Sequence, residues 1–392
     1  MITSALMSNY GNPDLEFEHG KGCYLYTPAG ERYLDFAMGI AVNCLGHCHP
    51  HLVQALQTQA EKLWHTSNLY RIGPTERLAK RLTELTFADR VFFCNSGTEA
   101  IEAGFKIMRR YHHDHGAPQR KRIISMTESF HGRTLAPVAA SRNPVHSEGF
   151  LFGDMGFDQV PFGDLRALEA AIGETTAGIV IEPIQGEGGI RLAPKEYLRS
   201  IRDLCDRHGL LLMFDEVQCG LARSGSFYAY QQTGVTPDLL ASAKGLGGGF
   251  PIGACLATEA TARPMVAGTH GSTFGGNPLA TSVGNAVLDV VTAPGFMDNL
   301  NAQAAYFRYG LQHLIERHPE KVVEHTGAGL MIGLRCKVNN AELVSQLSMH
   351  HMLVVKAGGN SIRLLPPLNV TRGEIDEALA ILEAVLADWR TP

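Results

Sequence analysis

The sequence predicts an α/β fold in which a mostly parallel sheet is wrapped by helices. Short apolar runs typical of buried strands alternate with longer helical segments through the middle of the chain. Such alternation favours a parallel sheet, because each parallel strand needs a crossover that is usually a helix. Beyond residue 317 the pattern changes to short strands and two helices. We expect this tail to join the N-terminal segment in a small α+β domain.

The individual elements follow from apolar runs and the turn residues between them. Pro28 to Gly30 predict the turn of a hairpin over 22–36. Strands are expected over 91–94, 123–126, 178–182 and 210–214, and helices over 49–63, 74–85, from 98, 194–208, 276–291 and 296–317. We expect the small domain to comprise residues 1–55 and 293–392, and the large domain residues 56–292.

The composition is that of an enzyme-sized globular protein. The chain has 392 residues, of which 45% are hydrophobic and 19% charged, so it can bury a large core and form two domains. A net charge of −5 argues against a nucleic-acid partner. Residues 1–12 lack the basic start and apolar centre of a signal peptide, and no stretch is long enough to span a membrane. A cytoplasmic location without a membrane partner is expected.

The eight cysteines are scattered, and several lie inside apolar runs. They show no paired spacing typical of a disulfide framework, which predicts reduced thiols. One cluster invites a metal reading: Cys44, His47, Cys48, His49 and His51. It lacks the Cys-x-x-Cys pairs of common zinc sites, and we expect no metal there.

Lys244 lies between two apolar runs, directly before a glycine cluster at 245–249. A Schiff-base lysine must sit on a rigid element, lose part of its hydration so that its pKa falls, and face backbone that admits a planar ligand. Lys244 satisfies these conditions on paper. The alternative is a surface lysine in a flexible glycine loop.

Asp215 follows the apolar run 210–214. Carboxylates at the C-terminal end of a buried parallel strand face the crevice in which α/β sheets bind ligands. Alone, Asp215 could be a helix N-cap or a magnesium ligand. Together with Lys244 it suggests an acid that keeps a pyridine nitrogen protonated, with Gln218 within reach of the ring substituents.

A candidate phosphate site follows the strand at 91–94, where Asn95, Ser96, Gly97 and Thr98 precede a helix. Helix N-termini offer free N–H groups and the positive end of a dipole to anions. The alternative is that Asn95 or Ser96 is only an N-cap. The segment lacks the lysine of a Walker A loop, which disfavours nucleoside triphosphates.

These motifs, together with 22–26, 45–50 and 361–364, resemble the class III aminotransferases of fold type I nearly from end to end, and within that class the acetylornithine aminotransferase branch. The resemblance implies pyridoxal 5′-phosphate (PLP) as cofactor, with Lys244 and Asp215 as catalytic residues. The cofactor-binding residues that it implies are Ser96, Gly97, Thr98, Phe130, Asp215, Glu216, Val217, Gln218, Lys244 and Thr273.

The resemblance also implies roles around the substrate. Phe130 would stack on the cofactor ring and Arg133 would bind the substrate α-carboxylate through its guanidinium fork. Glu182 would pair with Arg363 while an amino donor is bound, and then release it to the α-carboxylate of 2-oxoglutarate. The alternatives are that Phe130 is a core residue, that Arg133 forms a surface ion pair and that Glu182 caps a strand end.

A further segment, residues 269–278, resembles the loop with which this family reaches across a two-fold interface. By that resemblance Thr273 binds the cofactor phosphate of the partner subunit and Ser272 touches the substrate. The alternative is a glycine-rich turn capped by Ser and Thr. If the resemblance holds, a homodimer with active sites at its interface is required for catalysis.

The implied reaction moves the terminal amino group of N2-acetyl-L-ornithine to 2-oxoglutarate, giving N-acetyl-L-glutamate 5-semialdehyde and L-glutamate in arginine biosynthesis. Succinylornithine, ornithine, 4-aminobutyrate and succinyldiaminopimelate would use the same catalytic set and stay open as donors. A nicotinamide-dependent dehydrogenase is the alternative from another class. It is disfavoured because Phe250 occupies the last glycine position of the dinucleotide fingerprint.

Overall fold

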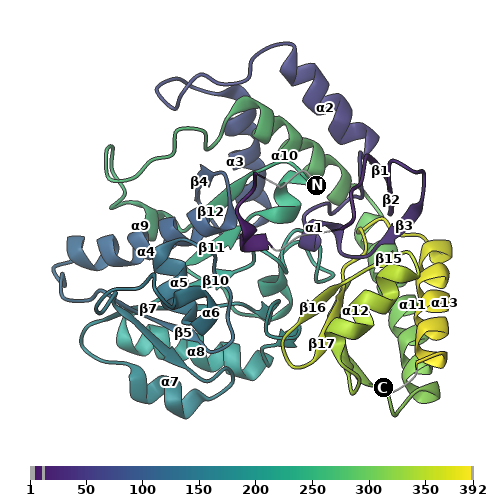
Figure 1. The fold of residues 1–392 in the computed structure, drawn as a ribbon. Helices are drawn as coiled ribbons and strands as arrows, with labels where there is room; N and C mark the ends of the chain where they lie inside the picture. The colour runs from purple at the N-terminus through teal and green to yellow at the C-terminus, as the bar shows by residue number, and fades with distance from the viewer. Residues whose placement is uncertain (1–4, 11–13, 390–392) are drawn as a thin grey trace.

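The computed structural model describes residues 5–10 and 14–389. Its centre is a seven-stranded sheet in the order β4-β12-β11-β10-β7-β5-β6 (Figure 1). The strands are β4 (Arg90–Cys94), β5 (Arg122–Met126), β6 (Phe157–Val160), β7 (Thr176–Ile181), β10 (Leu211–Asp215), β11 (Leu239–Ser242) and β12 (Gly253–Ala257). Only β12 is antiparallel to its neighbours, β11 and β4. The predicted α/β class with a mostly parallel sheet is confirmed.

Alternate residues of the strands face two different helical layers. On β10, Met213 packs in a cluster with α4 (Gly97–Asp114), whereas Leu212 and Phe214 pack in a cluster with α8 (Lys195–His208). All three side chains are fully buried. The continuous apolar run that we read as a buried strand is therefore explained by burial on both faces.

Further helices accompany the large sheet. They are α2 (Pro50–Ala60), α3 (Gly73–Leu85), α5 (Leu135–Ser141), α6 (Pro144–Ser147), α7 (Leu165–Ala171), α9 (Glu259–Ala262) and α10 (Pro278–Val291). Three short 3-10 turns are η1 (Ser8–Tyr10), η2 (Ala229–Gln232) and η3 (Lys244–Gly247). Helix α2 ends three residues before its predicted end at 63. None of the helices in the described ranges combines the length and apolar character needed to cross a membrane.

The C-terminal part of the chain builds a second layer beside the large sheet (Figure 1). Its sheet has the order β13-β14-β17-β16, and α11, α12 and α13 accompany it. The bounds are β13 (Val322–Ala328), β14 (Met331–Cys336), β16 (Val355–Ala357), β17 (Ser361–Leu364), α11 (Phe296–Arg317), α12 (Asn340–Met349) and α13 (Arg372–Ala387). The expected switch to short strands and two helices after residue 317 is confirmed.

The two ends of the chain meet in a small sheet of order β1-β2-β3-β15. Its strands are β1 (His19–Lys21), β2 (Tyr24–Tyr26), β3 (Arg32–Asp35) and β15 (Met352–Leu353). Strands β2 and β3 form the expected hairpin, and β15 runs parallel to β3 with Met352 opposite Leu34. The domain boundaries at 55 and 292 stay a prediction. The N-terminal stretch 1–12, where we expect no leader, lies partly outside the described residues.

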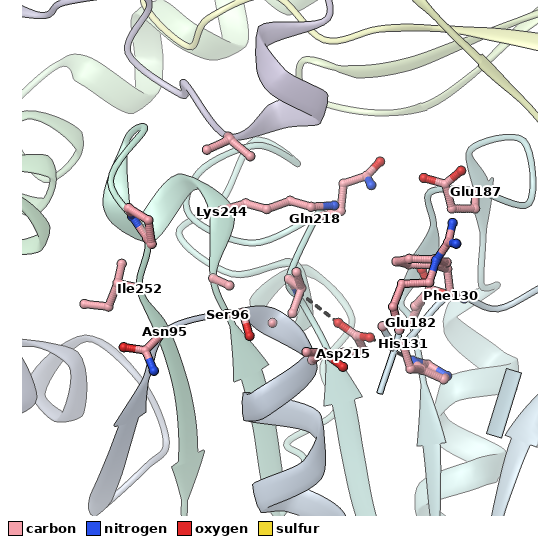
Figure 2. A pocket seen from close by; sticks show the side chains of 18 of the residues that line it. Asn95, Ser96, Phe130, His131, Glu182, Glu187, Asp215, Gln218, Lys244 and Ile252 are labelled. Atoms are coloured by element: carbon pink, nitrogen blue, oxygen red, sulfur yellow. Dashed lines mark hydrogen bonds and ion pairs between the residues drawn. The ribbon is translucent and has the colours of Figure 1, made fainter. Parts of the chain in front are cut away.

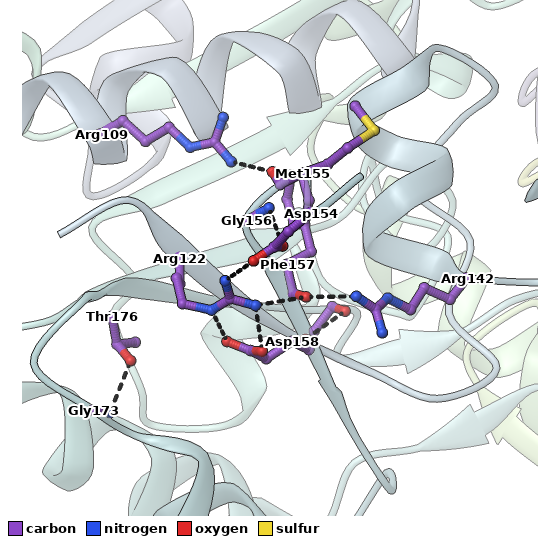
Figure 3. Close-up of polar contacts among 11 residues, drawn as sticks. Arg109, Arg122, Arg142, Asp154, Met155, Gly156, Phe157, Asp158, Gly173 and Thr176 are labelled. Atoms are coloured by element: carbon purple, nitrogen blue, oxygen red, sulfur yellow. Dashed lines mark hydrogen bonds and ion pairs between the residues drawn. The ribbon is translucent and has the colours of Figure 1, made fainter. Parts of the chain in front are cut away.

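The loop between α5 and β6 is closed at its base by three arginines (Figure 3). Arg142 donates to the carbonyl of Phe157 at 3.0 Å, and Arg109 donates to the carbonyl of Met155 at 3.1 Å. Arg122 pairs with Asp158 at 2.7 Å. The hydrogen bond from Arg142 to Phe157 thus joins the start of the loop to its end.

Candidate active site

A cavity of about 390 Å³ lies where the strands of the large sheet end (Figure 2). Strand ends and the loops that follow them supply most of its lining, from β4, β5, β7, β10 and β11. This is the edge at which open α/β sheets bind ligands. The structure brings ten predicted site residues into the lining: Ser96, Gly97, Thr98, Phe130, Arg133, Glu182, Asp215, Val217, Gln218 and Lys244.

Lys244 begins the 3-10 turn after β11 and extends into the cavity toward Gln218 (Figure 2). Its backbone is left-handed, with φ of 44°, a conformation that a side chain beyond glycine rarely adopts and that is often found at functional sites. The residue keeps some exposure through the open cavity, but desolvation of its ammonium, followed by repulsion from Arg363, lowers the pKa of Lys244 to about 8. A substantial neutral fraction near neutral pH makes it a usable nucleophile and base.

Asp215 is the last residue of β10 and is 4% exposed. Its Oδ1 accepts the backbone N–H of Val217 at 3.0 Å, and its Oδ2 lies 2.7 Å from Nδ1 of His131. Each carboxylate oxygen has two acceptor positions, so capacity remains toward the cavity that Asp215 lines. The arrangement is suited to holding a protonated ring nitrogen.

The N-terminus of α4 forms a polar cradle at the cavity. Ser96 is the N-cap and its side chain accepts from Glu99 N, while Gly97 and Thr98 start the first turn, where N–H groups have no partner within the helix. A Cβ on Gly97 would lie 2.7 Å from Val217, and one on Gly132 would lie 2.2 Å from Oγ1 of Thr98. Both glycines are needed for this close packing around the helix N-terminus, a position suited to binding an anion.

Phe130 and Arg133 come from the loop between β5 and α5 and lie on one side of the cavity. The guanidinium carbon of Arg133 is 5.2 Å from the centre of the Phe130 ring. The contact holds the cation over an aromatic face. The pair thus offers a ring surface and a carboxylate-binding group to the same space.

Arg363 pairs with Glu187, and not with Glu182 as the family resemblance led us to expect. Its Nη1 lies 2.6 Å from Oε1 of Glu187 and its Nη2 lies 3.1 Å from Oε2. The side chain of Glu182 instead accepts the backbone N–H groups of Phe130 and Gly186, at 3.1 and 3.3 Å. Our prediction of the Glu182–Arg363 pair is wrong, because the Glu182 carboxylate binds the backbone N–H groups of Phe130 and Gly186 instead.

Four predicted residues lie outside the cavity lining: Arg363, already described, and Glu216, Ser272 and Thr273. Glu216 is fully buried and its carboxylate accepts the backbone N–H groups of Ala229 and Tyr230, so its expected cofactor contact is corrected to a structural role. Ser272 accepts a hydrogen bond at 3.1 Å from the side chain of Asn95, which does line the cavity. Thr273 does not line this chain's cavity either.

Sequence reasoning missed two polar residues of the site. Glu187 lines the cavity from the turn between β8 (Ile184–Gln185) and β9 (Arg191–Leu192). His131 also lines it, and its side chain is 0% exposed. The signal for both was present, since His131 stands between Phe130 and Arg133 in one motif and Glu187 follows Glu182 in another.

A strained turn that sequence reasoning also missed forms part of the wall. Helix α1 (Met38–Ala41) has left-handed φ values of 49°, 62°, 62° and 64°, which places Val42 on the cavity. Left-handed residues other than glycine cost about 1–2 kcal/mol each. Asp35 stabilises the turn by accepting the N–H groups of Ala37 and Met38 at 2.8 and 2.9 Å.

The cysteine–histidine cluster at 44–51 has structural contacts in the described residues. Cys44 donates to the carbonyl of Gly245 at 3.2 Å, directly beside the lysine turn. The His47 ring nitrogen Nε2 lies 2.8 Å from Asp35, and that of His51 lies 2.9 Å from Asp289. These contacts join the N-terminal segment to the cavity wall and to α10.

Comparisons with known proteins extend the match over nearly the whole chain. The family model described as Aminotransferase class-III matches residues 6–386. An acetylornithine aminotransferase from Agrobacterium fabrum is 56% identical over 382 residues, which are 97% of this chain and 96% of the relative. The N-acetylornithine aminotransferase structure from Stenotrophomonas maltophilia K279a has a TM-score of 0.84 at 35% identity and covers 97% of both chains.

A third relative bears on the cofactor. The ornithine aminotransferase structure from Toxoplasma gondii has a TM-score of 0.91 at 30% identity, the match covers 96% of this chain and 91% of that one, and that structure has partial occupancy of PLP at its active site. The cavity fits that group, since it combines a low-pKa lysine, a carboxylate and a glycine-lined helix N-terminus. With the family model matched from residue 6 to residue 386, this chain belongs to the class III aminotransferase family, whose cofactor is PLP.

Proposed function

We propose that the enzyme transfers the terminal amino group of N2-acetyl-L-ornithine to 2-oxoglutarate, giving N-acetyl-L-glutamate 5-semialdehyde and L-glutamate in arginine biosynthesis. The observation that carries this proposal is the name of the relatives. Curated relatives called acetylornithine aminotransferase are 45–56% identical over nearly their full length. The cavity supports the same chemistry.

When bound, PLP supplies a carbonyl that takes up amino groups and a ring that absorbs negative charge. We assign Lys244 the role of holding the cofactor and then moving the proton at the reacting carbon as a general base, for which a pKa of about 8 is well suited. Asp215 holds the proton on the ring nitrogen. The first turn of α4 binds the phosphate through the N–H groups of Gly97 and Thr98.

Two arginines serve the two substrates. Arg133 binds the donor α-carboxylate, beside the Phe130 ring that it contacts. Arg363 is neutralised by Glu187 while the donor lies in the site, because the reacting end of the donor carries no carboxylate. When 2-oxoglutarate binds, Arg363 exchanges Glu187 for a substrate carboxylate. Buried arginine pairs of this bidentate kind give strong and directional binding.

The donor assignment is tested by comparing kcat/KM for N2-acetyl-L-ornithine, L-ornithine and 4-aminobutyrate with saturating 2-oxoglutarate. We expect the acylated donor to be preferred over ornithine by about 10–200-fold, the range over which pocket contacts discriminate similar substrates. Comparable efficiency with free ornithine would contradict the assignment. In that case the enzyme would still be assigned as a transaminase, but its pathway would be a different one.

We further propose that two copies assemble with active sites at their interface. Two segments touching each other expose large apolar side chains: Asn68 donates to the carbonyls of Ser272 and Gly275, both at 3.1 Å. The exposed set, here called the apolar patch, is Leu63, Trp64, Leu69, Tyr70, Val266 and Phe274. Large apolar side chains exposed on two segments in contact favour a protein partner. One of the two segments contacts the cavity lining, since Ser272 accepts from Asn95, so a second copy seated there would lie near the cavity.

Subunit complementation tests both the dimer and the role of Thr273. Lys244→Ala and Thr273→Ala chains are unfolded and refolded together at limiting PLP, and each is refolded alone as the control. If Thr273 serves the partner's site, the mixed dimer contains one site with both native residues, and activity exceeds the sum of the two controls. Activity equal to that sum would show that Thr273 does not act across an interface.

The expected cytoplasmic location has one structural support. All eight cysteines are free, and seven of them are buried. Free buried thiols are typical of proteins in reducing compartments. Fractionation of the source cells, with activity measured in each fraction, tests this placement.

A further inference from the structure

His131 lies against the acid of the cofactor site rather than against a substrate-binding group. Its Nδ1 is 2.7 Å from Oδ2 of Asp215, and its side chain is 0% exposed. Because an ionised carboxylate only accepts hydrogen bonds, Nδ1 must carry the proton in this contact. The ring therefore donates to the one carboxylate that faces the cofactor nitrogen.

The position of the ring is fixed independently of Asp215. The backbone N–H of His131 donates to Oγ of Ser141 at 3.2 Å, and the neighbouring Phe130 N–H donates to Glu182 at 3.1 Å. The other ring nitrogen, Nε2, is buried and has no hydrogen-bond partner among the described residues. A buried polar atom without a partner is unfavourable, so a histidine here needs a reason. Within the described part of the chain, its ring makes one hydrogen bond, to Asp215.

Electrostatics supports the same assignment. Burial lowers the pKa of His131, but the hydrogen bond to Asp215 and the charges of Asp215 and Glu182 outweigh burial and raise it. Burial raises the pKa of Glu182 to about 7, while His131 opposes that shift. The charges of the two carboxylates, Asp215 and Glu182, thus favour the protonated imidazole of His131. Without the histidine, Oδ2 of Asp215 would lose the hydrogen bond that orients it.

We propose that His131 is a positioning residue of the cofactor site: through Nδ1 it holds the Asp215 carboxylate in the orientation that faces the cofactor ring nitrogen. A carboxylate held in that orientation can accept a hydrogen bond from a protonated ring nitrogen, whereas a rotated one cannot. His131 touches neither the substrate nor the reacting carbon in this role. The inference goes beyond the proposed function, because it concerns the cofactor nitrogen and holds for any amino donor.

The decisive comparison uses two cofactors on the full-length protein. Dissociation constants are measured by fluorescence for PLP and for 1-deaza-PLP, in which carbon replaces the ring nitrogen. We expect His131→Phe to weaken PLP binding by at least about tenfold and 1-deaza-PLP binding by no more than about twofold, since only PLP offers a nitrogen to Asp215. Equal weakening of both cofactors would overturn the proposal, because a merely structural histidine affects both alike.

Two amide variants keep the test valid even if His131→Phe does not fold. The amide of Asn reaches about the position of Nδ1, and that of Gln about the position of Nε2. We expect His131→Asn to keep PLP affinity and kcat within about tenfold of the native values. His131→Gln should lose about 100-fold in kcat with a donor KM within about threefold. Equal behaviour of the two variants would contradict a role through Nδ1.

A matched control is His112, which is also buried and whose Nε2 lies 2.7 Å from the carbonyl of Ala177, away from the cavity. His112→Phe removes a buried histidine hydrogen bond of the same kind. We expect it to lower thermal stability about as much as His131→Phe while leaving PLP affinity within about twofold. A loss of PLP affinity in both variants would assign the effect to general destabilisation and would overturn the proposal.

Discussion

Arg363 donates two hydrogen bonds to the Glu187 carboxylate, with Nη1 2.6 Å from Oε1 and Nη2 3.1 Å from Oε2. Arg363 is 1% exposed, whereas the Glu187 side chain is 38% exposed. The arginine is therefore fixed and the glutamate is free to move toward solvent. Such a pair can open for an incoming carboxylate without moving the cation.

The first prediction concerns Arg363→Leu. Its removal takes away the buried cation that binds the acceptor, and truncating one partner of a buried charge pair costs about 2–5 kcal/mol. We expect KM for 2-oxoglutarate to rise by about 30-fold or more, while KM for the amino donor changes little. Glu187→Gln, which leaves Arg363 without a competing carboxylate, should lower KM for 2-oxoglutarate. An unchanged acceptor KM in Arg363→Leu would remove Arg363 from the substrate site.

The second prediction concerns the reactivity of Lys244 before the cofactor binds. Its pKa is lowered from 10.5 to about 8, chiefly by burial, so its neutral amine becomes abundant above pH 8. The rate at which the cofactor-free enzyme combines with PLP, followed by visible absorbance, should rise with pH and level off near 8. A rate that still rises steadily toward pH 10.5 would indicate a lysine with normal hydration.

The third prediction is that Lys244→Ala has no detectable turnover but keeps its fold. The side chain extends into the cavity, so circular dichroism and the unfolding midpoint should stay close to native values. Lys80→Ala is the matched control, because Lys80 is an exposed lysine that only pairs with Glu84 at 3.7 Å. Turnover by Lys244→Ala above the level of cofactor-free protein would contradict the assignment.

The fourth prediction distinguishes two effects of replacing a glycine: backbone strain at a positive φ and a steric clash of the added Cβ. Gly132 has φ of 131°, and a Cβ there would lie 2.2 Å from Oγ1 of Thr98 in the polar cradle at the N-terminus of α4. Gly116 also has a positive φ, of 76°, but a Cβ there would meet no atom within 4 Å. Both alanine variants should lose stability, whereas only Gly132→Ala should also lose PLP affinity, by about tenfold or more. We would measure both by thermal unfolding and PLP titration.

Much of the site was predictable because the carboxyl ends of parallel strands lie at one edge of a sheet. Ser96, Asp215 and Lys244 each stand at or just beyond the end of an apolar run, and parallel strands bring such ends together. The direction of β12 was not predictable in this way. An apolar run carries no information on strand direction, and β12 is antiparallel to both neighbours.

The Arg363 pair could not be resolved from sequence, since Glu182 and Glu187 stand in one motif and 176 residues separate Glu187 from Arg363. The β8–β9 hairpin carries Glu187 outward to the arginine, while Glu182 stays at the end of β7. The left-handed turn at 38–41 was hidden for another reason. Only one of its four residues is a glycine, so nothing in the sequence announces its backbone.

The most direct test of the account follows the visible spectrum of the purified enzyme through one complete cycle. N2-acetyl-L-ornithine is added to the PLP-loaded enzyme without acceptor, and 2-oxoglutarate is added afterwards. We predict that the absorbance band of the enzyme-bound aldehyde form disappears with the donor and returns with the acceptor. A band that ignores N2-acetyl-L-ornithine but responds to another amine would contradict the donor assignment. Failure to bind PLP at all would contradict the account of the site.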